Sequence, residues 1–207
     1  MTSPRGQRNY EKVIQGFQSW MNRQHTLEVF DPEKSPASTR PFMVMNDLQN
    51  YLTDNNNQKL NGIIDVLFDD SDGFIPTDII PDYVAVFSIL LKINKGPYIK
   101  YFTRHGSLND AKLPFDPKTP PQHWPVGDNH SDFLENFCKH QWAFCAPPLP
   151  PATSDQYFDS KTVLPITFKK TLQSGISANL SLIHVHPCYN KLLPEIERRQ
   201  VSPKRLD

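Results

Sequence analysis

The chain has 207 residues, of which 38% are hydrophobic, and it contains 20 prolines but only 8 glycines. This length suits one large domain or a domain with an appendage, and the composition favours a globular protein with stiff connections. Lysine plus arginine and aspartate plus glutamate both number 22, so no net field attracts nucleic acid or an anionic membrane.

The sequence favours an intracellular protein. No run approaches the roughly 18 apolar residues of a membrane span, and the polar start MTSPRGQRNYEK lacks the apolar stretch of a signal peptide. We therefore expect a cytoplasmic protein with no membrane or nucleic-acid partner. Cys138, Cys145 and Cys188 form neither an even set nor a CxxC pair, so we expect buried free thiols rather than disulfides or a zinc site.

The first predicted element is an amphipathic helix over residues 9–24, followed by a linker. Its apolar stripe at helical spacing consists of Val13, Ile14, Phe17, Trp20 and Met21. Such a stripe is usually part of a core or a docking face, and less often a helix that binds a separate protein. The run DPEKSPASTRP at 31–41 has no periodicity and is typical of a linker, so residues 1–41 form an N-terminal segment.

The next predicted unit is a helical hairpin. Residues 42–51 and 58–68 each show helical periodicity, and the turn-prone run DNNN lies between them at 54–57. The acidic loop at 69–78 is similar in composition to a calcium loop. If Gly73 takes the sixth place, however, Phe68 and Ile79 occupy the first and last ligand positions, so a helix-capping turn is favoured.

Residues 81–94, PDYVAVFSILLKIN, form the most apolar segment and predict a central core helix, with a short helix after it at 98–104. The following stretch, 105–129, contains five prolines, and we expect it to be extended over the surface.

A further helix is predicted to open at Asp132, because Glu135 three residues on gives the spacing of a capping box. Cys138 or Cys145 with His140 is a conceivable nucleophilic pair, but no residue in the sequence supplies a lowered thiol pKa or orients the pair. The proline-rich run APPLPPATS ends the helix, so residues 42–154 form a helical platform domain.

Residues 163–187 have the spacing of two strands around a small-residue turn at 173–178. His184, His186 and Cys188 would project from one side of the second strand, which leaves a metal site as an alternative to coincidence. The predicted fold class is therefore α+β, with a mainly helical N-terminal platform followed by a small antiparallel β-hairpin.

Several short motifs in the chain carry a family resemblance: QWAFCAPPL, VLPI, the turn SGISA and VHPCYN, preceded by DYVAVFSILLKIN, YIKYF and LNDAKLPF back to about Phe42. With these motifs the chain resembles a family of fungal proteins in which a helical N-terminal region precedes a protein-kinase domain. It implies that residues 155–207 are a truncated kinase-like N-lobe. The hairpin would be the first two strands of that lobe, and its glycine-rich turn would cover the nucleotide phosphates.

The resemblance also implies a vestigial nucleotide site. Gln173 stands where the family has the first glycine of the turn, and Gly175 and Ile176 stand where it has a glycine pair. The terminal VSPKRL corresponds to a third strand, although Pro203 is a poor strand residue. The implied nucleotide-binding residues are Gly175, Ser177, Ala178, Leu180 and Lys204, with Lys204 as the lysine that pairs with the phosphates.

We expect no kinase activity from this polypeptide, because the sequence contains no HRD and no DFG motif. The expected function is a non-catalytic accessory or interaction module that binds a protein through the hairpin or the N-terminal helix. The alternative is an N-terminal fragment of an ATP-dependent Ser/Thr protein kinase. No cofactor is expected unless the kinase resemblance is functional, in which case ATP and magnesium are. The basic run at 198–205 also carries weak nuclear-import and Ser202 phosphorylation signals.

Overall fold

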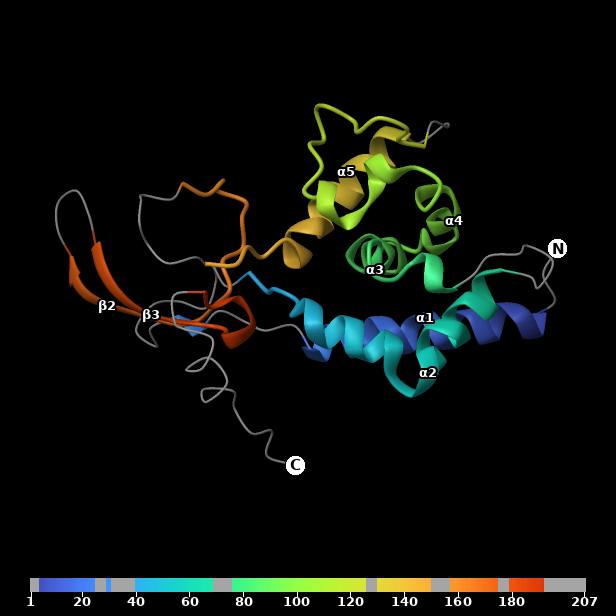
Figure 1. The fold of residues 1–207 in the computed structure, drawn as a ribbon, viewed down its shortest axis with the longest axis horizontal. Helices are drawn as coiled ribbons and strands as arrows, with labels where there is room; N and C mark the ends of the chain where they lie inside the picture. The colour runs from blue at the N-terminus through green and yellow to red at the C-terminus, as the bar shows by residue number, and fades with distance from the viewer. Residues whose placement is uncertain are drawn as a thin grey trace.

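The computed structural model describes residues 4–24, 29–30, 40–68, 76–125, 130–149, 157–174 and 179–191. A helical body lies on one side and a small sheet extends from the other, which confirms the α+β prediction (Figure 1). The helices and strands are α1 (Pro4–Gln24), β1 (Val29–Phe30), α2 (Met45–Leu67), α3 (Val84–Lys92), α4 (Ile99–Phe102), α5 (His130–Gln141), β2 (Ile166–Ser174) and β3 (Asn179–Val185).

Helix α1 is the predicted amphipathic helix, and its apolar stripe is part of the main core rather than a free docking face. Ile14, Phe17 and Met21 are buried in the same cluster as residues of α2 and α3. The Trp20 ring also stacks on Tyr51 of α2, with 3.8 Å between ring centroids. Burial of this stripe joins the N-terminal segment to the helical platform.

The two predicted helices with a break at 54–57 are confirmed, because α2 consists of two helical segments joined by four residues with non-helical backbone, but the pair does not form a hairpin. Both halves of α2 lie along α1 in one direction: residues 47–54 adjoin Trp20, and residues 58–63 adjoin Val13. The kink contains Asn55, Asn56 and Asn57, all with positive φ. Asparagine tolerates this left-handed conformation, so the three asparagines can redirect the helix at this point. The chain does not reverse there, because both segments run along α1 in the same direction.

Helix α3 is the centre of the core, as its composition predicts, since every residue from Val84 to Leu91 is buried. A buried helix start needs partners for its free N–H groups. Asp110 supplies them from a distant part of the chain: its carboxylate oxygens accept from the N–H groups of Ala85 at 2.9 Å and Val86 at 2.8 Å. The Asp110 N–H also donates to the Asp82 carbonyl at 2.8 Å.

The expectation that residues 105–129 extend over the surface is only partly correct. Leu108, Phe115 and Trp124 are buried in the main core. Short 3₁₀ helices form at Gly106–Leu108 and Asp110–Lys112. Prolines rule out long regular elements here, but they do not prevent the intervening aromatic side chains from packing inward.

Helix α5 fixes the proline-rich segment to the body. The fully buried Gln141 side chain accepts from the Phe115 N–H at 2.7 Å and donates to the Phe115 carbonyl at 2.8 Å. The helix begins at His130, so Asp132 lies inside its first turn and not at the predicted capping position. The Gln141 amide thus pairs with the backbone N–H and C=O groups of Phe115, which have no partner in a helix or sheet.

A second, smaller core joins the sheet to the helices. It contains Phe42, Val44, Ala146, Val163 and Tyr189. The Tyr189 hydroxyl donates to the Met43 carbonyl at 3.0 Å and accepts from the Met45 N–H at 3.2 Å, at the start of α2. This junction fixes the base of the sheet to the helical body.

The predicted hairpin is confirmed, since β2 and β3 pair in antiparallel register. The sheet order is β1-β2-β3, and β1 adds to β2 in parallel through Val29 opposite Phe168 and Phe30 opposite Lys169. The neighbour of β2 thus comes from the N-terminal side of the chain. The C-terminal VSPKRL segment, interpreted as a third strand, lies outside the described residues.

Asp110 predicts a measurable pH dependence of stability. Burial raises its pKa from 3.8 to about 6, with a smaller contribution from Asp82, although the N–H groups of α3 act in the opposite direction. The folded chain therefore binds this proton more tightly than the unfolded chain. The stability from this group is fully present below about pH 4 and is lost as the pH rises through about 6.

We expect Asp110→Asn to remove this dependence, because asparagine does not titrate. Between pH 4 and pH 7, the free energy of unfolding of the wild type should fall by roughly 1–3 kcal/mol more than that of the variant. Urea denaturation across this range measures the difference, and parallel pH profiles of the two proteins would contradict the assignment.

Tyr189→Phe tests the junction. Removing the hydroxyl leaves the Met43 carbonyl and the Met45 N–H without this partner, so we expect a loss of about 1–2 kcal/mol of unfolding free energy. Tyr157→Phe is the matched control, because Tyr157 is 93% exposed. Equal effects of the two substitutions in chemical denaturation would show that the hydroxyl bridge contributes nothing.

Candidate functional site

Of the five residues that the kinase resemblance implies for nucleotide binding, the structure locates Leu180 alone. Gly175, Ser177, Ala178 and Lys204 lie outside the described residues. Leu180 is on β3 with 60% of its surface exposed. The described part of the structure therefore neither assembles nor excludes the nucleotide cradle.

One face of the hairpin carries a row of exposed side chains that ends at the half-buried Phe168. Residues directly opposite each other in a sheet share a face, and Lys170 is opposite Leu182 while Phe168 is opposite His184. The Phe168 and His184 rings lie 4.8 Å apart. Leu182 is 46% exposed and Leu180, two residues along the same strand, continues the row.

The opposite face is covered only at its base. Ile166 is buried, and Val185, which lies opposite it, is half-buried against the small core around Phe42 and Tyr189. Ile183, further along the strand on the same face, is 38% exposed. The hairpin is thus anchored at one end, and none of the described helices reaches its other end (Figure 1).

The charge of the hairpin is positive. The described residues of β2 and β3 include Lys169 and Lys170 but no carboxylate. β3 pairs with β2 alone among the described residues, so no described strand occupies the N–H and C=O groups of its outer edge. This surface combines a strand edge, exposed leucines and positive charge, which is a typical arrangement for binding an extended peptide.

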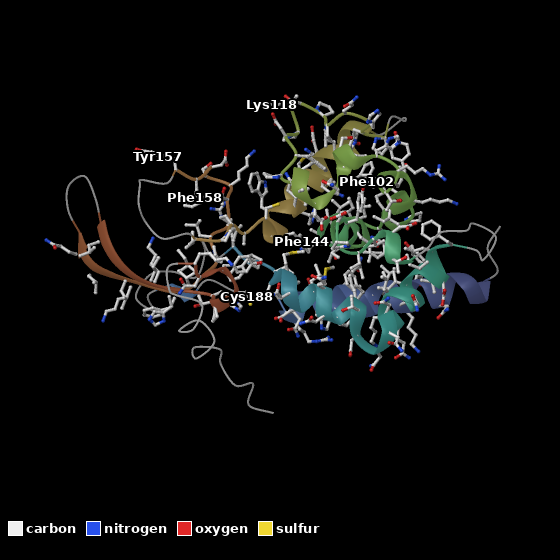
Figure 2. The ribbon with its side chains drawn as sticks, viewed as in Figure 1. Phe102, Lys118, Phe144, Tyr157, Phe158 and Cys188 are labelled. Carbon is white, nitrogen blue, oxygen red and sulfur yellow. The ribbon has the colours of Figure 1, made fainter. Side chains whose placement is uncertain are left out.

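The alternative metal site at His184, His186 and Cys188 finds no support in the geometry. No group of three or more histidines, cysteines or acidic residues with metal-binding geometry occurs in the described ranges. The His186 ring nitrogen Nδ1 accepts from the Cys188 N–H at 3.3 Å, and burial lowers the pKa of His186. Cys188 lies near the start of α2, where Asn46 contacts its sulfur at 4.0 Å (Figure 2).

The cysteines of the α5 region do not have the environment of nucleophiles. Burial, with a contribution from Asp116, raises the pKa of Cys138 to about 11, and its thiol donates to the Phe115 carbonyl at 3.3 Å. Burial raises the pKa of Cys145 to about 12. The His140 ring nitrogen Nδ1 contacts the carbonyl of Asn136 at 2.8 Å, within its own helix. Neither thiol is therefore activated as a thiolate.

Sequence reasoning missed a pocket of about 570 Å³ beside α5, which we call the cationic pocket. Its lining includes Arg40, Lys118, Cys138, Lys139, Trp142 and Lys161. Figure 2 shows Lys118 on the loop beside α5, and Tyr157 on the segment that leads from α5 toward the hairpin. Four separate stretches of chain supply its cations, so no local motif could have revealed it.

Comparison with family models, with curated proteins and with solved structures found no match for this chain. None of the helices in the described ranges is both long and apolar enough to cross a membrane. The functional argument therefore rests on the chain's own geometry.

Proposed function

We propose that this chain is a non-catalytic interaction module in which the helical body holds the β2–β3 hairpin for pairing with an extended segment of a protein partner. The observation that supports this most strongly is that the base of the hairpin is fixed to the helical body while the side chains further along its edge strand are exposed. Its base is anchored through Tyr189, while Leu180 and Leu182 are 60% and 46% exposed on the edge strand. A partner strand added to β3 would satisfy the free edge and cover these leucines.

The free energy of burying the exposed leucines favours binding of such a partner strand. Full burial of a leucine side chain contributes about 1.5–3 kcal/mol, so two half-exposed leucines leave a substantial fraction of that free energy for binding. Exposed apolar strand edges are usually protected in monomeric proteins, because they otherwise pair with other chains. The hairpin has this surface without protection from the described helices.

The charge of the hairpin specifies the partner. A strand that pairs with the outer edge of β3 would lie next to Leu182 on one face and next to Ile183 on the other, and Lys169, which is opposite Ile183, lies one strand further in. An apolar residue would contact Leu182, and an acidic residue on the opposite face would point to the side of the sheet that carries Lys169, whose positive charge acts across the width of one strand. We therefore propose a partner segment that alternates apolar and acidic residues.

We also propose that the module derives from a fungal protein-kinase-like protein and acts inside the cell, in the cytoplasm. The antiparallel strands on either side of residues 175–178 support this origin, together with the sequence resemblance. The absence of HRD and DFG motifs from the chain supports a non-catalytic role.

A peptide-binding experiment tests the interaction surface. We expect a short peptide that alternates valine and glutamate to bind the full chain and to shift the NMR signals of residues 179–185. Leu180→Ser/Leu182→Ser should weaken binding by about tenfold, because the apolar contact area is lost. A peptide that alternates valine and lysine should not bind.

Leu172→Ser is the control, since Leu172 is an equally exposed leucine on β2, at 58%. It should change the affinity less than about twofold. Equal binding of the two peptides, equal effects of the two sets of variants, or self-association of the wild type through β3 in sedimentation velocity would each contradict the proposed partner.

A second candidate function is the nucleotide-binding part of an ATP-dependent Ser/Thr kinase, which the antiparallel hairpin around residues 175–178 favours. On the interaction proposal, we expect no phosphate transfer from ATP with magnesium to generic substrates above that of a Lys204→Met variant. Turnover above this variant, or magnesium-dependent ATP binding that Lys204→Met abolishes, would support the kinase function instead.

A further inference from the structure

The cationic pocket has the composition of a binding site for a small anion. Arg40, Lys118, Lys139 and Lys161 line it, and the only acidic lining residue among those described is Glu135. None of these four basic side chains forms a hydrogen bond or ion pair with another described residue. The whole chain has no net charge, so this clustering is a local feature. Like charges held together destabilise a fold unless an anion binds among them.

Neighbouring carboxylates reduce the positive charge but do not cancel it. Asp116 and Asp159 flank the pocket, and their Oδ1 atoms accept from the backbone N–H groups of Lys118 at 2.9 Å and Lys161 at 2.7 Å. These two carboxylates shape the loops that carry the lysines. Counting Glu135 with them, cations still outnumber carboxylates by four to three.

The remaining lining is apolar. Trp142 is half-buried and forms one wall, together with Pro117 and the buried Cys138. Trp142 also lines a second cavity of about 470 Å³ with Phe158 and Phe144, so it borders both cavities. A flat aromatic face next to several cations fits a ligand that combines a planar apolar group with an anionic group.

We propose that the cationic pocket binds small aromatic phosphates, with the ring of the ligand against Trp142 and its phosphate among Lys118, Lys139, Lys161 and Arg40. The volume of about 570 Å³ lies within the range of small-molecule sites. A dianionic phosphate can accept hydrogen bonds from several of these side chains at once. This site is separate from the hairpin, so it does not depend on the proposed function.

Calorimetry with phenyl phosphate as the probe tests the proposal on the full chain at low salt. We expect phenyl phosphate to bind more tightly than either inorganic phosphate, which lacks the ring, or phenol, which lacks the charge. The affinity should fall as salt is added, because screening weakens the charge contacts. Lys204→Met should leave the binding unchanged, which separates this site from a nucleotide cradle at the hairpin.

The lysines provide a matched pair of variants that should not disturb folding, since all of them are exposed. Lys118→Gln/Lys161→Gln should weaken phenyl phosphate binding by about tenfold or more. Lys112→Gln/Lys191→Gln removes the same charge outside the pocket and should change the affinity less than about twofold. Thermal unfolding confirms that each variant is folded.

Four results would overturn the proposal. Absence of binding heat at millimolar phenyl phosphate would show that the pocket is not a ligand site. Equal affinities for phenyl phosphate and inorganic phosphate would show that Trp142 contributes nothing. Equal weakening by the two double variants would show that binding follows net charge and not the pocket. Tighter binding of a phosphotyrosine peptide than of phenyl phosphate would replace the small molecule with a peptide ligand.

Discussion

The Tyr189 hydroxyl is the contact on which the arrangement of the two parts depends. It bonds to both the Met43 carbonyl and the Met45 N–H, and so it connects the residue that follows the hairpin to the start of α2. Phe42 packs edge-on against the same ring, with 5.9 Å between centroids. Because this small core contains few side chains, each of its contacts carries a large share of the stability between hairpin and helical body.

The two parts of the molecule differ in how they are stabilised, and this difference underlies the functional proposals. The helical body has a continuous core around α3, whose buried start is satisfied by Asp110. The hairpin has a core at its base only, and its leucines further along the strands are exposed. A folded support with a strand edge that no described residue pairs is suited to binding, and the thiols of Cys138 and Cys145 have pKa values raised by burial.

The parts of the fold that could be predicted from the sequence are those with strong local periodicity. The apolar stripe of α1, the continuous apolar run of α3 and the alternation in β2 and β3 all indicated the correct element. The break predicted at 54–57 is present, but it redirects the helix instead of reversing the chain, because asparagine allows left-handed backbone in both settings. The burial of Phe115 and Trp124, and the convergence of Lys118 with Lys161, depend on tertiary contacts that no local pattern records.

Native-state hydrogen exchange of the unmodified chain tests the central claim most directly, because it reports the stability of each part separately. If the hairpin is fixed only at its base, amides of α3 should exchange only through global unfolding. Amides of Lys169–Thr171 and Leu180–Ile183 should then exchange faster, through local opening. Equal protection of α3 and the whole hairpin would show that the hairpin belongs to the helical core, and would contradict the account of it as an anchored but uncovered binding strand.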